Sequence, residues 1–501
     1  MNPIEEMKRE SIFLKVLGSG MLILAIGMLP SLIYDIVDGN DLKVFLYPML
    51  VILIVGTLFT VFSRYPSINN PIDGLLVIAL MWFMMVVIGS IPFILSGINF
   101  VDSIFESTSG ITTTGATILA DIESWPRGML MWRSMLQWIG GIMIILLFMF
   151  FLPMIGFGSR SLFGNETSGS GSGNLSLRLK DAGTQFVKIY MVLSIVLVLL
   201  LVVLGTPLYD SLCITFSTIS TGGFAPKGDS IASYSPIVKL VVALFMFLGG
   251  TNFYLHYKAT YHKKPSVYLH NQEFLIMVGI IVAASVFTIA VLSQTMGFNI
   301  DTVVDSIFTI VSASTTTGFA SIDYSLWISS LIAIMFLAIV IGGSAGSTAG
   351  GLKISRVVIL VKNAYNGLKS SLHPNAVYNV KMDKNIVDKT TVTNTVNLTI
   401  LFAMTLAIGT AVFMLLGSNF EISFTTALSS ITTFGPSMDH FGPYGSYNNM
   451  HTFGKLFMCF LMIVGRLEFI TALIVFTPGF WREFMLSRRS LLKKPFRGLR
   501  R

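Results

Sequence analysis

Long apolar stretches alternate with short polar segments along the whole chain. The first two apolar stretches cover roughly residues 12–36 and 42–63, and several later ones, such as "GLLVIALMWFMMVVIGSIPFIL", have a similar length. An α-helix needs about 20 apolar residues to cross the hydrocarbon core of a bilayer. The pattern therefore predicts an all-α polytopic membrane protein.

Four polar segments that interrupt this pattern are related to one another. They are "ITTTGAT" (111–117), "ISTGGFA" (219–225), "STTTGFA" (314–320) and "ITTFGPS" (431–437), which align on Gly115, Gly223, Gly318 and Gly435. In each copy a threonine stands two residues before the glycine, a hydroxyl residue three before, and serines six and twelve before. Three copies have an aspartate thirteen residues before, whereas the fourth has Ile422. We interpret these shared columns as an internal repeat.

Each copy lies between two apolar spans and follows a stretch of about ten residues that is too short to cross a bilayer. That stretch predicts a re-entrant half-helix, which in the first copy has Asp102–Ser103 as N-cap and Ser103 with Glu106 as capping box. The predicted fold has four tandem span–pore-helix–loop–span repeats around a pseudo-fourfold pore, plus two N-terminal transmembrane helices. The predicted units are an N-terminal helix pair (1–68), repeat 1 (69–160), repeat 2 with a Gly/Ser-rich lead-in (161–265), repeat 3 with a loop at 342–351 (266–368), repeat 4 (369–480) and a basic tail (481–501).

The four loops have the composition of a cation pore. Non-helical backbone at membrane depth must be buried in protein or line a watery cavity, and rings of backbone carbonyls can replace the hydration shell of K⁺. The loops contain no acidic residue, which argues against a divalent-cation site. The alternative is that they are glycine-rich packing motifs. The candidate K⁺ ligands, mainly through backbone carbonyls, are Thr112, Thr113, Thr114, Gly115, Ser220, Thr221, Gly222, Gly223, Thr315, Thr316, Thr317, Gly318, Thr432, Thr433, Phe434 and Gly435.

A second polar segment, "GGSAGSTAGG" (342–351), interrupts an apolar span of the third repeat. Its glycines disfavour a helix, so it is either a soft break that serves as a gate or a close-packed small-residue face. Arg466 lies deep in the last apolar span, where a charge is costly and usually marks function. It can hold the loop through its carbonyls or raise a barrier to cations, and the alternative is a structural pair with Glu468. The candidate gate residues are Gly342, Gly343, Ser344, Gly346, Ser347, Gly350, Gly351, Lys353 and Arg466.

Four single-glycine pore loops in one chain resemble the Trk/Ktr/HKT superfamily of potassium transporters. "WRSMLQWIGGIMI" (132–144), "FLGGTNFYLH" (247–256), "IGGSAGSTAGGLK" (341–353) and "VGRLEF" (464–469) resemble Trk-type membrane subunits in particular, as do the two additional N-terminal helices. The resemblance implies a gated K⁺-conducting subunit in which 342–351 is an intramembrane gating loop. It also implies a homodimer and a cytosolic regulatory subunit of TrkA type that binds a nucleotide (NAD or ATP). K⁺ is expected as the transported ion, without an organic cofactor.

Composition and charge fit this interpretation. The chain is 53% hydrophobic and 12% charged, against about 25% charged residues in soluble domains. Basic residues in short loops mark the cytoplasmic side, so we expect both termini in the cytoplasm and the pore loops outside, in a bacterial inner membrane. The net charge of +8 is then a topology signal and not a sign of nucleic-acid binding. Arg127 and Arg133 begin a span and are expected to reach the membrane interface.

Two other classes of function compete with a gated pore. An ion-coupled symporter (H⁺ or Na⁺) of the same fold remains the alternative to a channel-like pore, although two inverted repeats are more typical of symporters than four parallel ones. A membrane enzyme would need a cluster of catalytic or metal-binding groups, but the six histidines are scattered along the chain. Cys213 and Cys459 form no zinc-binding spacing.

Overall fold

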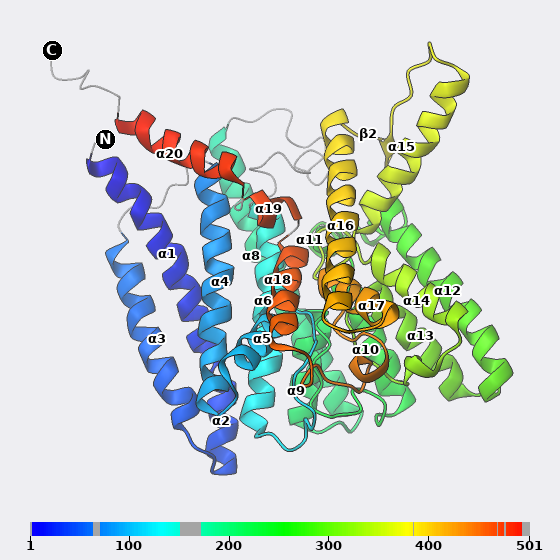
Figure 1. The fold of residues 1–501 in the computed structure, drawn as a ribbon, viewed down its shortest axis with the longest axis horizontal. Coiled ribbons are helices and arrows are strands. Elements are labelled where there is room, and N and C mark those ends of the chain that lie inside the picture. Colours follow the sequence, from blue (N-terminus) through cyan, green and yellow to red (C-terminus); the bar gives the residue numbers. More distant parts are fainter. Residues whose placement is uncertain are drawn as a thin grey trace.

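The computed structural model describes residues 3–63, 71–150, 172–383, 385–467, 469–474 and 477–492, most of which lie in helices (Figure 1). Within these ranges, seven helices are long and apolar enough to cross a membrane, or eight if one sharply bent pair is a single span. The prediction of an all-α polytopic membrane protein is confirmed.

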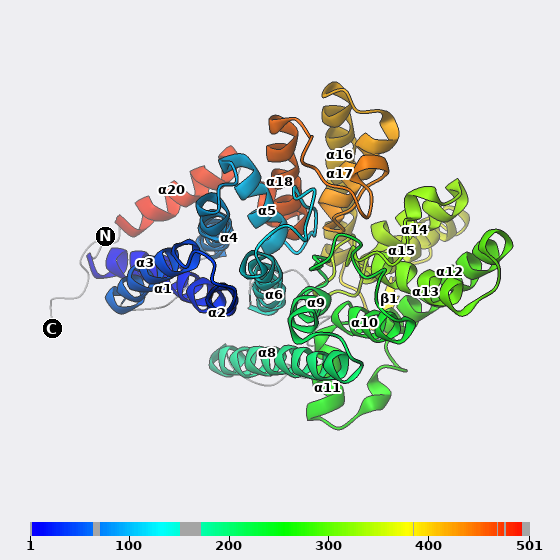
Figure 2. The same ribbon diagram turned by 90° about the horizontal axis from the view of Figure 1, so that it is seen from below.

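The two N-terminal spans lie to one side of the remaining helices (Figure 2). The first is formed by α1 (Pro3–Gly27) and α2 (Leu29–Asp38), and the second by α3 (Lys43–Phe62). The break between α1 and α2 precedes a proline in the first turn of α2, where proline is well tolerated. Small residues let the spans approach closely: a Cβ atom added to Gly18 would lie 2.8 Å from the carbonyl oxygen of Gly56.

Four groups of elements follow, each with a long helix, a short helix, a loop and a further apolar helix. The first group is α4 (Pro71–Leu95), α5 (Phe100–Ile111) and α6 (Arg127–Phe150). The second is α8 (Ser172–Val203), α9 (Leu208–Ile219), α10 (Pro236–Gly249) and α11 (Phe253–Tyr261), followed by η1 (Pro265–Val267). The third is α12 (Gln272–Met296), α13 (Ile300–Ser314), η2 (Tyr324–Leu326), α14 (Ser329–Ile341) and α15 (Ile354–Leu372). The fourth is α16 (Lys389–Leu415), α17 (Phe420–Thr432), η3 (Asp439–Phe441), α18 (Thr452–Arg466) and α19 (Phe469–Ile474).

The four groups pack in a closed ring. The second apolar helix of each group contacts the short helix of the next: α6 contacts α9, α10 contacts α13, α14 contacts α17, and α18 contacts α5. Viewed from below, the groups surround a central region that the four loops enter (Figure 2). The short helices occupy the half of the molecule opposite the two termini (Figure 1). The order of the groups around the ring is therefore their order in the sequence.

Three of the four short helices begin at an asparagine and not at the predicted Asp-Ser pair, whereas α9 follows Pro207 without a side-chain cap. Asn99 accepts the backbone N–H of Asp102 at 2.9 Å, and Asn299 and Asn419 cap α13 and α17 in the same way. Asparagine is a favoured N-cap because its side-chain oxygen takes one of the free N–H groups of the first turn. The predicted capping box of Ser103 and Glu106 is therefore wrong, since the helix has already begun and both side chains are buried inside the protein.

Three of the four second spans are interrupted, whereas α6 is continuous. The helices α10 and α11 meet at an angle of 95°, α14 ends at Ile341, and α18 ends at Arg466. A helix end inside a membrane leaves carbonyls that need partners. At the α10–α11 break, the carbonyls of Gly249 and Gly250 accept the N–H groups of Thr348 and Ser344 at 3.2 and 3.0 Å. Backbone groups at the breaks in the second and third groups thus form hydrogen bonds with each other.

Three further segments complete the described chain. Residues 164–171 of the predicted Gly/Ser-rich loop lie outside the described residues. The remainder of the predicted loop, from Ser172 onward, belongs to helix α8. The predicted basic tail begins within α20 (Pro478–Leu492). A two-stranded antiparallel hairpin of β1 (Lys381–Met382) and β2 (Asn385–Ile386) follows α15 at the end of the molecule that holds the termini (Figure 1).

Candidate functional site

Each short helix ends in the same backbone motif. The threonine two residues before the glycine is left-handed in all four loops, with φ of 55° at Thr113, 52° at Thr221, 50° at Thr316 and 56° at Thr433. In the first loop, Thr113 N–H donates to the Gly110 carbonyl and Thr114 N–H to the Ser109 carbonyl, both at 2.9 Å, and the other three loops repeat this pair of bonds. This is a Schellman motif with threonine where glycine is usual. A left-handed non-glycine residue costs roughly 1–2 kcal/mol, and such strain recurring in four places points to a functional site.

The four glycines form a closed ring of backbone contacts. Each has positive φ, between 82° and 100°. An added Cβ atom would lie 2.2 Å from the Gly222 oxygen at Gly115 and 2.1 Å from the Thr317 oxygen at Gly223. It would lie 2.0 Å from the Phe434 oxygen at Gly318 and 2.4 Å from the Thr114 oxygen at Gly435. Any side chain would collide with the next loop, so both conformation and space require glycine here.

Hydroxyl groups brace two of the loops from within. The Thr112 and Thr114 hydroxyls are 2.8 Å apart in the first loop, and the Thr315 and Thr317 hydroxyls are 2.8 Å apart in the third. The second loop has Gly222 at this position and the fourth has Phe434, so neither can form the same bond. The candidate ligand residues lie in these four loops, which are not chemically equivalent.

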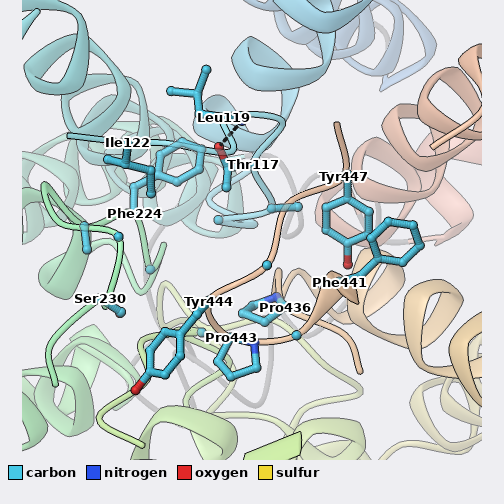
Figure 3. A pocket seen from close by; sticks show the side chains of 18 of the residues that line it. Thr117, Leu119, Ile122, Phe224, Ser230, Pro436, Phe441, Pro443, Tyr444 and Tyr447 are labelled. Carbon is cyan, nitrogen blue, oxygen red and sulfur yellow. Dashed lines mark hydrogen bonds between the residues drawn. The ribbon is translucent and has the colours of Figure 1, made fainter. Parts of the chain in front are cut away.

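A cavity of about 290 Å³ opens onto one face of the ring. It reaches Gly115, Gly223 and Gly318, and its walls include Thr117, Phe224, Pro436 and Tyr444 (Figure 3). Tyr447 joins the fourth loop to the first, because its hydroxyl donates to the Gly435 carbonyl at 3.0 Å and its N–H to the Thr117 carbonyl at 2.8 Å. The cavity therefore leads directly to the glycine ring.

A buried ion pair supports the first loop from behind. Arg133 Nε lies 2.6 Å from Glu106 Oε1, and the two side chains are 1% and 0% exposed. The other Glu106 oxygen accepts the N–H of Ile118 at 3.0 Å, and Thr117 Oγ1 bonds both charged groups. The prediction that Arg133 reaches the membrane interface is wrong, because its charge is satisfied inside the protein. Arg127 is exposed and pairs with Asp38.

The aspartate column of the repeat forms ion pairs between groups. Asp102 on α5 pairs with Lys455 on α18 at 2.6 Å, and Asp305 on α13 pairs with Lys239 on α10 at 2.9 Å. The third aspartate, Asp210, accepts the hydroxyl of Tyr234 at 2.8 Å instead. We did not predict these lysines as site residues, although a lysine inside an apolar helix is itself a signal.

The segment between α14 and α15 lies against the opposite face of the ring from the cavity. Gly350 N–H donates to the Thr316 hydroxyl at 2.6 Å, and the Thr221 hydroxyl lies 3.2 Å from that of Thr348. An added Cβ atom on Gly350 would lie 2.0 Å from the Thr432 oxygen. The segment therefore touches the second, third and fourth loops directly. Gly342, Gly346 and Gly351 have positive φ there, which explains why the span breaks.

Two charged side chains hold this segment. Arg466 is 4% exposed and donates from Nη1 to the Thr348 carbonyl at 2.7 Å, while its alternative partner Glu468 lies outside the described residues. Lys353 donates to the Ala349 carbonyl. The remaining predicted gate residues lie in the same segment, where Ser347 Oγ donates to the Ser344 carbonyl at 2.6 Å and Gly343 accepts the N–H of Ile354 at 3.1 Å.

A third charged group, which we did not predict, holds the same segment from the side. Glu273, in the first turn of α12, is 5% exposed and accepts the N–H groups of Ala345 at 2.7 Å and Ser355 at 3.2 Å. An acid at the start of an apolar span is typical of the first turn of a helix, so the sequence alone did not single it out. The structure instead places it as an anchor on both ends of the segment.

Comparisons with known proteins point to a single family. The sequence model of the family described as TrkH, cation transport protein, matches residues 48–482. The chain is 30% identical over 478 residues to the Trk system potassium uptake protein TrkH of Salmonella typhimurium, covering 94% of this chain and 98% of that protein. It is 31% identical over 418 residues to the protein of the same name from Escherichia coli, covering 82% and 86%. The crystal structure of the potassium transporter TrkH from Vibrio parahaemolyticus superposes with a TM-score of 0.85 at 26% identity, covering 94% of this chain and 99% of that one.

Proposed function

Because the chain belongs to the TrkH family of cation transport proteins, we propose that it carries K⁺ across the membrane through the ring of four loops. The resemblance to Trk-type subunits is confirmed, and the relatives' names identify them as potassium uptake proteins and not enzymes. The observation that carries the proposal is the closed ring, in which each glycine contacts a carbonyl of the next loop.

The backbone of the loops supplies the ligands. In each loop the Schellman motif uses two carbonyls near the helix end, so the carbonyls of the residues that follow take no part in these helix-end bonds. Several dipolar oxygens can replace the water around a monovalent cation without a fixed charge. The negative ends of the four short helices point toward the same ring and add attraction for a cation.

The segment 342–353 is proposed as the gate. It lies against the ring, and Arg466 donates a hydrogen bond to its Thr348 carbonyl at 2.7 Å. Loops rich in glycine and serine can change conformation at small energetic cost. We expect the segment to move aside when the subunit opens, under control of a cytosolic nucleotide-binding subunit of TrkA type.

The cellular setting belongs to the same proposal. The termini, α15 and the hairpin occupy one end of the molecule (Figure 1), and we assign that end to the cytoplasm of a bacterial inner membrane because the basic loops lie there. A homodimer with one pore in each protomer is proposed as the assembly.

A channel-like pore is favoured over an ion-coupled symporter of the same fold. The carboxylates of Asp102, Glu106 and Asp305 on the short helices are each held by a lysine or an arginine. Breaking such an ion pair is costly, so these carboxylates are poorly placed to serve as ligands for a coupling cation.

The test is cation flux into liposomes that hold the purified protein. We expect K⁺ and Rb⁺ to enter faster than Na⁺, Gly318→Ser to abolish that preference, and Arg466→Ala to raise flux in the absence of a regulator. Flux of no cation, with or without a cytosolic partner and nucleotide, or an unchanged preference in Gly318→Ser, would refute the pore axis. A strict dependence of K⁺ entry on a proton or Na⁺ gradient would favour the symporter.

A further inference from the structure

The second loop lacks the internal brace that the first and third loops have. Thr114 and Thr317 each bond the hydroxyl two residues earlier at 2.8 Å, but the second loop has Gly222 at the corresponding position. The Gly222 carbonyl is nevertheless a member of the ring, since it lies against Gly115 of the first loop. Some other group must hold this carbonyl if the four quadrants are to keep a common geometry.

Gln137 supplies the missing brace from a different repeat. It lies on α6 and is fully buried. Its Nε2 atom donates to the Gly222 carbonyl at 2.6 Å, and its Oε1 atom accepts the N–H of Phe224 at 3.1 Å. One amide group therefore binds the backbone on both sides of Gly223. The orientation of the amide is fixed by its partners, because a carbonyl only accepts and a backbone N–H only donates.

The Gln137 amide leaves no room for a side chain at position 222. A Cβ atom added to Gly222 would lie 2.4 Å from Cδ of Gln137 and 2.5 Å from its Oε1. Gly222 is not among the residues with positive φ, so its backbone does not itself require glycine. The glycine is needed for the space that the Gln137 amide occupies, which makes the two residues a matched pair.

We propose that Gln137 is a positioning residue that sets the ion selectivity of the second quadrant by fixing the Gly222 carbonyl. This inference rests on the proposed function, since the carbonyl matters only if cations pass the ring. A ligand carbonyl that also accepts a hydrogen bond in a buried site is restrained in distance and direction. Without this restraint, the carbonyl can approach a smaller ion, and the preference for K⁺ over Na⁺ falls.

The experiment compares four variants in liposomes by Rb⁺ uptake and its competition by K⁺ and Na⁺. Gln137→Met keeps the side-chain volume but removes both hydrogen bonds, and Gly222→Ala displaces the amide. We expect each to lower the K⁺/Na⁺ preference by about tenfold, the size of effect that the loss of a single good hydrogen bond produces. Gln137→Ala combined with Gly222→Thr should restore most of the preference that Gln137→Ala alone loses. The reason is that the introduced threonine hydroxyl can reach that of Ser220, as in the first and third loops.

The outcomes separate this inference from the proposed function. A selective wild type with an equally selective Gln137→Met variant overturns the role of Gln137 and leaves the pore intact. The same holds if the double variant, shown to be monodisperse by size-exclusion chromatography, is no more selective than Gln137→Ala. A wild type that passes no Rb⁺ refutes the proposed function and this inference together. Restoration of selectivity in the double variant supports both, because a purely structural role predicts recovered stability without a recovered ion preference.

Discussion

Replacing Lys455 with methionine is expected to destabilise the protein strongly. Replacing Lys455 and its partner Asp102 together is not. Lys455 Nζ lies 2.6 Å from Asp102 Oδ1, and the two side chains are 7% and 10% exposed. Lys455→Met leaves the Asp102 carboxylate buried without a counter-charge, which costs about 3–5 kcal/mol. Asn99 also donates to this carboxylate, at 2.6 Å, but a neutral amide cannot replace the lost charge.

The double variant Asp102→Asn with Lys455→Met removes both charges. Replacing a whole buried ion pair by neutral groups of similar volume is often neutral or stabilising. The two single effects should therefore not add, and the coupling energy should be about 3 kcal/mol. The natural precedent is the fourth repeat, which has Ile422 in place of the aspartate.

The assay is thermal unfolding of the detergent-solubilised protein, followed by the loss of the monodisperse size-exclusion peak. With an unfolding entropy of about 2.1 cal/mol/K per residue, a chain of 501 residues shifts by about 1 °C per kcal/mol, so Lys455→Met should lower the midpoint by about 3–5 °C. Arg127→Met is the control, because Arg127 is 47% exposed in its pair with Asp38 and surface pairs contribute about 0–1 kcal/mol. Equal shifts for Lys455→Met and the double variant would refute the reasoning, since they would mean that the stranded carboxylate costs nothing.

Two further predictions concern the segment 342–353. Glu273→Ala leaves the N–H groups of Ala345 and Ser355 without their acceptor, which costs about 1–3 kcal/mol for a buried group. We therefore expect a several-fold rise in Rb⁺ flux into liposomes in the absence of a regulator. An unchanged flux would contradict the role of Glu273 as an anchor of the segment. Thr316→Gly and Thr113→Gly both relieve left-handed strain of about 1 kcal/mol, but only Thr316 accepts a hydrogen bond from the segment. Regulator-free flux should therefore rise in Thr316→Gly alone, and an equal rise in both variants would assign the effect to the loops themselves.

Much of the site could be predicted from sequence because it is repeated. Four copies of one pattern identified the glycines, the threonines two residues before them and the spans around them without a partner being known. The soft segment and Arg466 were found because each violates the apolar pattern of a membrane helix. These signals are local, so a single sequence suffices to detect them.

The parts that the sequence did not reveal depend on partners far apart in the chain. Gln137 meets Gly222 across 85 residues, and Lys455 meets Asp102 across 353. The serine column was misleading for a related reason. Ser103 suggested a helix cap, but it is fully buried and its hydroxyl donates to the Ile98 carbonyl at 3.2 Å, so its small size is what the site requires. Arg133 was misplaced because its partner Glu106 lies on a different helix.

The two ion pairs between groups also divide the ring mechanically. One joins the fourth group to the first, and the other joins the second to the third. At the remaining two boundaries, where α6 meets α9 and α14 meets α17, the aspartate column forms no such pair in the described structure. The two ion pairs thus join the four groups into two half-shells, and we expect a rearrangement that keeps both ion pairs to change the contacts at these two seams. Gln137 lies at the seam between α6 and α9, and the contact between Gly350 and Thr432 lies beside the seam between α14 and α17.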